Sequence, residues 1–234
     1  MKRIYLVRHA TAQDKGEGLP DLERSLTKKG EKEAKAVARH LAREYGVPDL
    51  MISSFANRAI ETAHLTANAF GYPPQKILLR DTFYGTTAID ALAGEIVKQP
   101  DRYRSLMLFG HDPAFSRLAA HLVKGFRQEI PKAGVVAADF PAERWADLKG
   151  GTGKLLEYTS PARLKDEKKR ARCDLEARLV RSWDGILGRV NKAVAADLKD
   201  EVRKSARKIA KEFLKSRKKA RRNGPGNAPN RPVR

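Results

Sequence analysis

The chain has 234 residues, of which 41% are hydrophobic and 32% are charged, and its formal net charge is +20. This composition is typical of a globular protein with a charged surface, and no apolar run is long enough to cross a bilayer. The single cysteine, Cys173, excludes an internal disulfide and a cysteine-based zinc site. The apolar run after Met1 is too short for the core of a signal peptide, so we expect a cytoplasmic protein without a membrane span.

The positive charge is concentrated in the last third of the chain. Residues 1–160 contain 24 Lys and Arg against 19 Asp and Glu, whereas residues 161–234 contain 24 against 9. This asymmetry predicts two regions with different roles. We expect a first domain over 1–160 and a basic helical extension over 161–222. The remaining residues, 223–234, are rich in Gly, Pro and Asn and are expected to form a disordered tail.

Short apolar runs alternate with amphipathic segments in the first domain. In chain order, we expect a strand at Lys2–Val7, a helix from Thr27 to about Tyr45, a strand at Leu50–Ser53, a helix at Ala56–Phe70, a strand at Lys76–Leu79, a helix at Ala88–Lys98, a strand at Ser105–Phe109, a helix at Pro113–Lys124, and two closing strands at Val135–Phe140 and Lys154–Tyr158. This alternation favours an α/β fold with three α/β/α layers and a mostly parallel central sheet. In the extension, apolar residues recur at three- and four-residue steps, which predicts one or two long helices.

Several basic side chains and histidines fall at one expected edge of this sheet. Arg8 and His9 directly follow the first strand, and Arg24 lies in the loop after it. Arg58 lies in the first turn of the helix after the second strand, and His111 directly follows the fourth strand. Because active sites of such sheets lie beyond the carboxyl ends of the strands, we expect these side chains to converge there.

These residue types match the needs of phosphoryl transfer. A neutral imidazole can attack phosphorus and hold the phosphoryl group covalently. Arginine donates two hydrogen bonds to a phosphate in one plane and can stabilise the charge of the transition state. A second histidine can donate to a non-bridging oxygen. This chemistry requires no metal or other cofactor, and the sequence offers no evident carboxylate cluster for one.

The motifs resemble those of the histidine phosphatase superfamily, whose members have a phosphoglycerate mutase-like fold, and most of all the small SixA-type phosphohistidine phosphatases. The family motif Arg-His-Gly corresponds here to Arg8-His9-Ala10, and Arg-Pro-Leu-Thr corresponds to Arg24-Ser25-Leu26-Thr27. The motif Ser-Pro-x-x-Arg-Ala-x-x-Thr corresponds to the segment from Ser53 to Thr62, and Gly-His corresponds to Gly110-His111. Two positions depart from the pattern, since Ala10 replaces the usual glycine and Ser54 stands where proline is common. The resemblance covers about residues 1–160.

The resemblance also assigns roles, position by position. It implies that His9 is the nucleophile, and that Asp81 stands in the register where many superfamily members place a proton donor. The catalytic residues expected on this basis are His9, Arg8, Arg58, His111 and Asp81. The expected substrate-binding residues are Arg8, Arg24, Arg58 and His111. No metal ligand and no cofactor is expected.

The implied function is a metal-independent phosphatase that hydrolyses a phosphate ester or a phosphohistidine through a phosphohistidine on His9. The substrate would be a phosphorylated protein, such as a histidine phosphotransfer domain, or a small phosphorylated molecule. One alternative is a phosphomutase, which would pass the phosphoryl group to a sugar acid. Another is a catalytically weak module that binds a polyanion through its basic extension. Polyphosphate, nucleic acid, an acidic protein or a membrane surface could each be attracted to the run Lys215–Arg222.

Overall fold

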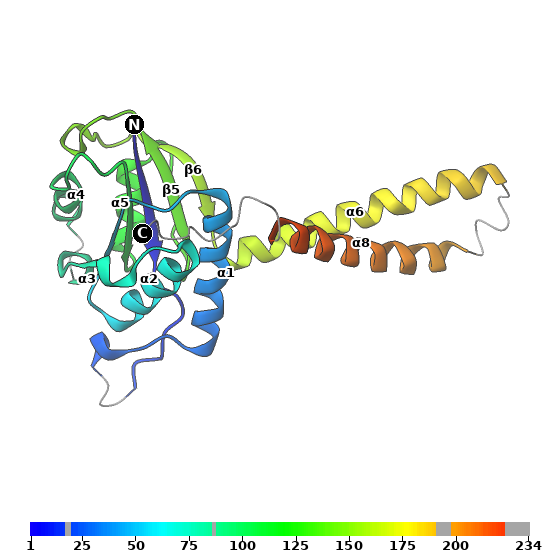
Figure 1. Ribbon diagram of the computed structural model, residues 1–234, viewed down its shortest axis with the longest axis horizontal. Coiled ribbons are helices and arrows are strands. Elements are labelled where there is room, and N and C mark those ends of the chain that lie inside the picture. The colour runs from blue at the N-terminus through cyan, green and yellow to red at the C-terminus, as the bar shows by residue number, and fades with distance from the viewer. Residues whose placement is uncertain (17–19, 86–87, 191–197, 223–234) are drawn as a thin grey trace, which may run out of the picture. The chain divides into compact units, whose positions relative to one another are not determined.

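The computed structural model describes residues 1–16, 20–85, 88–190 and 198–222 of the chain (Figure 1). Residues Met1–Leu164 form one compact unit, and a second unit begins at Lys165. The division falls within the long helix α6 (Pro161–Val190), so the first turn of that helix belongs to the first unit. The expected disordered tail over 223–234 lies outside the described residues.

A six-stranded sheet forms the centre of the first unit. Its strands are β1 (Lys2–Arg8), β2 (Leu50–Ser53), β3 (Leu78–Leu79), β4 (Ser105–Gly110), β5 (Val135–Phe140) and β6 (Lys154–Thr159), in the spatial order β3-β2-β4-β1-β5-β6. The pairs β1–β4, β2–β4 and β2–β3 are parallel, whereas β5 and β6 are added antiparallel. The mostly parallel sheet predicted from the sequence is therefore confirmed. Because β4 lies between β1 and β2, the carboxyl ends of these three strands are adjacent.

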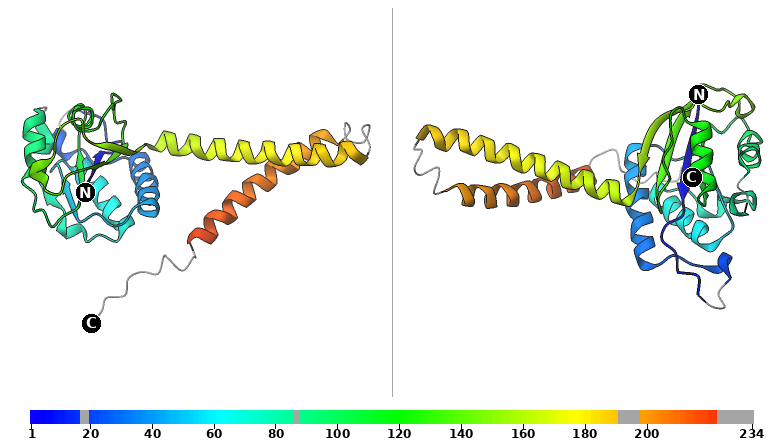
Figure 2. Two further views of the ribbon diagram at one scale, coloured as in Figure 1. Left: turned by 90° about the horizontal axis from the view of Figure 1, so that it is seen from above. Right: turned by 180° about the vertical axis from the view of Figure 1, so that it is seen from behind.

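Helices cover both faces of the sheet, as the view of Figure 1 and the two further views of Figure 2 show. One face carries α1 (Lys28–Glu44) and α2 (Asn57–Phe70), and the other carries α4 (Ile89–Val97) and α5 (Ala114–Leu122). Successive side chains of β1 point to opposite faces of the sheet and so contribute to two separate hydrophobic cores. Ile4 and Leu6 pack with the apolar side chains of α4 and α5, whereas Tyr5 and Val7 pack with those of α1 and α2. The predicted three-layer α/β/α architecture is thus confirmed.

The ends of the elements follow local sequence signals in most places. The Thr27 hydroxyl accepts a hydrogen bond from the Gly30 amide and caps α1, and Gly71 ends α2 with a φ of 70°. The expected strand Lys76–Leu79 is shorter than predicted, because Pro74–Lys76 form the 3₁₀ helix η2 and only Leu78–Leu79 pair with β2. Pro74 has a fixed φ and starts this turn.

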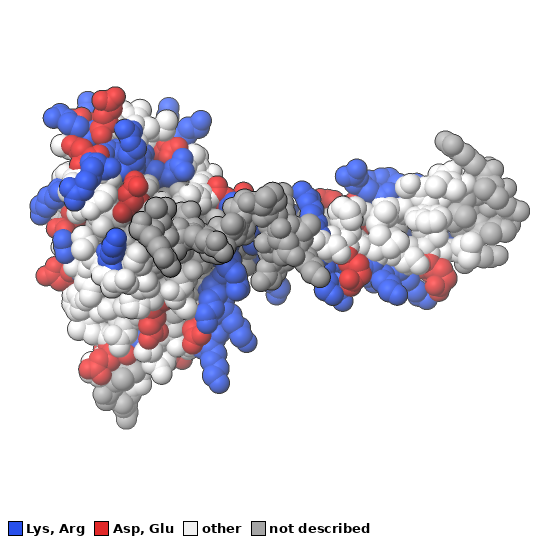
Figure 3. Space-filling model, viewed as in Figure 1, with Lys and Arg blue, Asp and Glu red and all other residues white. Residues whose placement is uncertain are grey.

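Within its described residues, the second unit contains the rest of α6 and the helix α8 (Lys199–Arg222). Ala206 and Ala210 of α8 are fully buried, and Arg207 Nε donates to Glu176 Oε1 of α6 over 3.1 Å. The two helices are therefore in contact. Figure 3 shows Lys and Arg side chains spread along this pair. No helix within the described ranges is long and apolar enough to span a membrane.

Candidate active site

The ends of β1 and β4 bring two histidines together. His9 follows β1 and His111 follows β4, and the centroids of their rings are 5.0 Å apart. The His9 amide donates to the Gly110 carbonyl over 3.0 Å, which extends the pairing of β1 and β4 by one residue. The separation of the two rings is therefore fixed by the sheet itself.

The His9 ring is held in one tautomer. Its Nδ1 lies 2.8 Å from the carbonyl oxygen of Ala10. A carbonyl can only accept, so Nδ1 carries the ring proton and Nε2 keeps a free lone pair. Burial, supported by the charges of Arg58 and Arg8, lowers the pKa of His9 to about 4. The ring is therefore neutral at neutral pH, which is the form that can act as a nucleophile.

Ala10 fits the position where the family has glycine. Ala133 is the one non-glycine residue with a positive φ within the described part of the chain, so Ala10 has a negative φ that any residue can adopt. The Ala10 amide donates to the Thr62 hydroxyl over 3.1 Å, and that hydroxyl donates to the Arg58 carbonyl over 2.7 Å. Thr62 thereby connects the loop after His9 to the first turn of α2.

Arg8 presents a donor that an anion could bind. Its Nη1 donates to the carbonyl of Ile130 over 2.8 Å and lies 3.8 Å from Asp112 Oδ2. Its Nε is buried and has no hydrogen-bond partner among the described residues. An unpaired buried donor costs about 1–3 kcal/mol, and an acceptor oxygen of a ligand would remove this cost.

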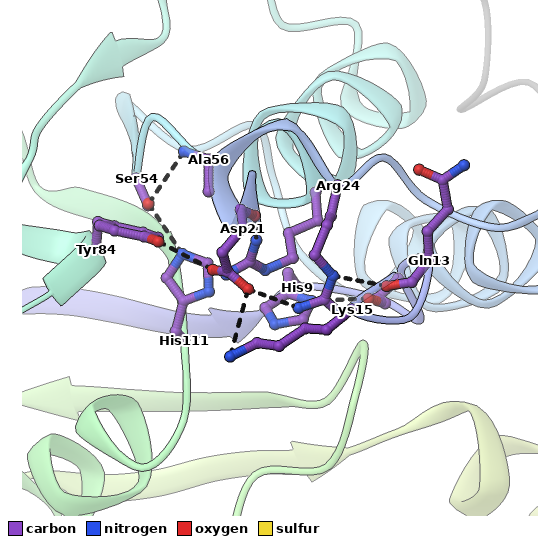
Figure 4. Close-up of polar contacts among 11 residues, drawn as sticks. His9, Gln13, Lys15, Asp21, Arg24, Ser54, Ala56, Tyr84 and His111 are labelled. Atoms are coloured by element: carbon purple, nitrogen blue, oxygen red, sulfur yellow. Dashed lines mark hydrogen bonds and ion pairs between the residues drawn. The ribbon is translucent and has the colours of Figure 1, made fainter. Parts of the chain in front are cut away.

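Asp21 links the other two predicted arginines, and Figure 4 shows its contact with Arg24. Asp21 lies in the 3₁₀ helix η1 (Asp21–Glu23), and its carboxylate accepts from Arg24 Nη1 over 2.8 Å and from Arg58 Nη2 over 2.7 Å. It also accepts from the Tyr84 hydroxyl over 2.9 Å and lies 3.9 Å from Lys15 Nζ. Burial acts against ionisation, but the hydrogen bonds from Arg24, Arg58 and Tyr84 hold the pKa of Asp21 well below its ordinary value. Asp21 is therefore an anion at neutral pH.

Ser54 orients the second histidine. The Oγ atom of Ser54 lies 2.9 Å from His111 Nε2 and accepts from the Ala56 amide over 3.3 Å. Burial, together with the charges of His9 and Arg58, lowers the pKa of His111 to about 3, so its ring is neutral. Among the described residues, His111 Nε2 is the acceptor within reach of the Ser54 hydroxyl proton. We infer that Ser54 donates to Nε2, which leaves the proton of His111 on Nδ1, free to donate to an anion.

Replacing Ser54 by Ala should allow the proton of the neutral His111 ring to move between Nδ1 and Nε2. The Nε2 atom of His111 would lose its donor, and the preference for the Nδ1–H form should fall by about 1 kcal/mol. Nitrogen NMR of the His111 ring would show the two tautomers in exchange instead of one. Ser53→Ala is the matched control, because the Ser53 hydroxyl is equally buried but donates to the Ser54 carbonyl. An unchanged His111 spectrum in Ser54→Ala would contradict this assignment.

The structure does not bring Asp81 to these groups. Asp81 is exposed, and its Oδ1 accepts from the Thr82 amide at the start of the short helix α3 (Thr82–Gly85). Tyr84 of the same helix does reach the site, and its ring lies 5.5 Å from that of His111 and 5.2 Å from that of Phe55. The proton-donor role predicted for Asp81 thus has no contact with either histidine to support it.

The sequence did not reveal Asp21 and Ser54 as parts of the site. The spacing of Asp21, three residues before Arg24, was the available signal, because a short helical turn places such a pair side by side. Within the described residues, no group of three or more His, Cys, Asp or Glu side chains is arranged to hold a metal ion. The arrangement combines buried cationic donors with two neutral imidazoles, a set of groups that can bind an anion.

Comparisons with known proteins show similarity over the first part of the chain. Residues 4–114 match the model of the histidine phosphatase superfamily (branch 1). An uncharacterized chloroplastic protein of Arabidopsis thaliana is 30% identical over 129 residues, which is 52% of this chain and 59% of that protein. The chain therefore spans only about three fifths of the length of this relative.

Solved structures extend the similarity to about two thirds of the chain. A protein described as a phosphohistidine phosphatase SixA, from Agrobacterium tumefaciens, is 27% identical with a TM-score of 0.58, over 68% of this chain and 98% of that chain. The protein histidine phosphatase SixA in complex with tungstate shares the fold, with 17% identity and a TM-score of 0.60 over 69% of this chain and 99% of that chain. The predicted phosphoglycerate mutase-like fold and the resemblance to SixA proteins are thereby confirmed.

Proposed function

We propose that this chain, whose first domain belongs to the histidine phosphatase superfamily, releases phosphate from its substrate through a phosphohistidine on His9, without a metal. One observation carries the proposal. His9 is neutral, its Nε2 is free, and it lies in a cluster of cationic and donor groups made by Arg8, Arg58 and His111. Arg24 adds a further cation beside Arg58 through their shared contact with Asp21.

The first step transfers the phosphoryl group to His9. His9 Nε2 forms a bond to phosphorus, and the bond from phosphorus to the leaving atom breaks with the electron pair on that atom. The His9 ring becomes cationic, and the hydrogen bond from Nδ1 to the Ala10 carbonyl stabilises this form. The arginines and His111 Nδ1 would donate to the non-bridging oxygens, where charge is greatest in the transition state.

The second step returns His9 to its neutral form. A water molecule forms a bond to phosphorus, and the electron pair of the breaking P–N bond returns to His9 Nε2. Both protons of the water leave with the product as dihydrogen phosphate, so charge and protons balance without a separate base. The same groups that bind the phosphoryl oxygens serve in both steps.

We propose a phosphohistidine on a protein, such as a histidine phosphotransfer domain, as the substrate, with small phosphorylated molecules as the other substrate class. The similarity of the first unit to the SixA protein of A. tumefaciens supports this choice. The ring of Tyr84, whose centre lies 5.5 Å from that of His111, offers an aromatic surface against which an imidazole ring could pack. Imidazole can also leave without a strong acid, and among the described residues the Asp81 carboxylate contacts the Thr82 amide and neither histidine. We further propose that this reaction takes place in the cytoplasm, as expected from the sequence.

The purified chain should release inorganic phosphate from a phosphohistidine protein and from p-nitrophenyl phosphate. Both substrates remaining intact would contradict the proposal. Adding a sugar acid to the same assay distinguishes a phosphatase from a phosphomutase, because a mutase would yield phosphorylated sugar acid in place of free phosphate.

The pH dependence of the reaction should reflect the low pKa of His9. The neutral ring is the active form, so kcat/KM should not fall as the pH is lowered through 6.5, the ordinary histidine value, and should fall only near pH 4, where His9 gains a proton. Rates with p-nitrophenyl phosphate, corrected for ionisation of the substrate, would measure this. Circular dichroism should be recorded alongside these rates to check that the protein stays folded. His9 and His111 gain their protons at a higher pH in the unfolded chain than in the folded protein, so the free energy of unfolding decreases as the pH falls below 6.5. A midpoint at 6.5 in folded protein would contradict the assignment.

The basic extension supports a separate proposal about partners. From residue 203 to residue 222 the chain has eleven Lys and Arg and a single acid, Glu212. Lys208 and Lys211 are exposed on α8, and we propose that this helix contacts a polyanion. The affinity of the full chain for polyphosphate, measured against salt concentration, tests this contact, and an affinity independent of salt would contradict it.

A further inference from the structure

Asp21 places a negative charge beside two of the arginines assigned to phosphate. Its carboxylate accepts hydrogen bonds from Arg24 and Arg58, and its backbone carbonyl accepts a third from Arg58 Nη1 over 2.5 Å. A phosphoryl group bound by these arginines would lie next to this carboxylate. Like charges at such a distance repel, so Asp21 weakens the binding of an anion unless another part of the substrate compensates for it.

Asp21 also lies nearer to solvent than the arginines that it contacts. Its side chain is 31% exposed, against 15% for Arg24 and 7% for Arg58. His9 approaches phosphorus from the end of β1, and in-line displacement requires the leaving group to depart on the opposite side, toward solvent. Figure 4 shows the Asp21 carboxylate between Tyr84 and Arg24, with a contact to each. The leaving group would therefore pass Asp21.

We propose that Asp21 is a specificity-determining residue that favours substrates with a cationic leaving group, namely phosphoramidates such as a ring-protonated phosphohistidine, over phosphate esters. This inference rests on the function proposed above. The ring N–H of a phosphorylated imidazolium would donate to Asp21, a hydrogen bond between opposite charges. An ester oxygen instead gains negative charge as its bond to phosphorus breaks, and Asp21 would repel it.

The chemical step balances with such a substrate. His9 Nε2 forms its bond to phosphorus, the P–N bond of the substrate breaks, and its electron pair goes to the substrate ring. The ring already carries a proton on its other nitrogen, held by Asp21, so it leaves as neutral imidazole. No proton is transferred during this step, and Asp21 remains a carboxylate throughout.

The experiment compares phosphoimidazole with p-nitrophenyl phosphate in the full chain. Asp21→Asn keeps the shape of the side chain but removes its charge. We expect the ratio of kcat/KM for phosphoimidazole to that for p-nitrophenyl phosphate to fall by about tenfold or more, as for the loss of one hydrogen bond to a charged group. Any displacement of Arg24 and Arg58 would affect both substrates alike, so it cancels in the ratio. Glu23→Gln is the matched control, because Glu23 is an exposed acid in the same η1 helix and its carboxylate does not contact the site.

The outcomes separate this inference from the function on which it rests. A wild-type chain that hydrolyses neither substrate overturns both. A wild-type chain that is active, with the same ratio in Asp21→Asn, overturns the role of Asp21 and leaves the phosphatase function standing. Asp21→Ser, a second neutral variant checked for folding by circular dichroism, should lower the ratio as well, and an unchanged ratio there would also overturn the role.

Discussion

His9→Ala should lower kcat for both phosphohistidine and p-nitrophenyl phosphate by about 10⁴-fold or more, the effect expected when the nucleophile of a covalent mechanism is removed. The reason is that no other described side chain can replace it. His111 is neutral, but Ser54 holds its Nε2, and its Nδ1 carries a proton. A loss of this size in kcat, measured at saturating substrate, would show that His9 takes part in the reaction itself.

The control for this variant is His64→Ala. His64 lies on α2 and is exposed, so its removal should leave kcat unchanged. Because His9 is partly buried at a strand end, thermal unfolding of both variants should be recorded beside the kinetics. A folded His9→Ala variant that keeps even a tenth of the wild-type kcat would contradict the nucleophile role.

Arg58→Ala is the second variant with a large expected effect. The Arg58 side chain is 7% exposed, and its guanidinium lies 5.9 Å from the ring centre of Tyr84. We expect kcat/KM to fall by about 10²–10³-fold, as for other donors that stabilise charge in a transition state. Lysine should restore only part of the activity, because it lacks the planar fork that binds two phosphoryl oxygens at once.

Arg43→Ala provides the control for the loss of a positive charge. Arg43 is exposed near the end of α1, and we expect its removal to leave kcat/KM unchanged. If Arg58→Ala and Arg43→Ala reduced activity equally, Arg58 would contribute only through the net charge of the domain. Unchanged activity in Arg58→Ala would remove Arg58 from the site.

The sequence predicted the fold and the proximity of His9 and His111 because both depend on strong local patterns. Buried strands, amphipathic helices and the order of Arg8-His9, Arg58 and His111 along the chain were sufficient to place these side chains at adjacent strand ends. The parallel sheet then brought the two histidines together over a separation of about a hundred residues. No feature of this prediction required knowledge of a loop conformation.

The residues that the sequence did not reveal lie in loops or act through a single hydrogen bond. Asp21 reaches the arginines because η1 turns the chain back over the strand ends, and a three-residue turn has no periodicity to detect. Ser54 stands where the family commonly has proline, and its hydroxyl contacts His111. Asp81 had the expected register, but its carboxylate contacts the Thr82 amide. Register along the chain does not determine which way a loop side chain points.

The central claim is the covalent phosphohistidine, and rapid quenching of the reaction tests it most directly. The full chain would be mixed with phosphoimidazole, quenched in base within the first turnover, and digested for mass spectrometry. The account predicts a phosphoryl group on His9, stable in base and labile in acid, that is absent in His9→Ala. A first turnover that releases phosphate without any phosphorylated enzyme, or with the phosphoryl group on another residue, would contradict it.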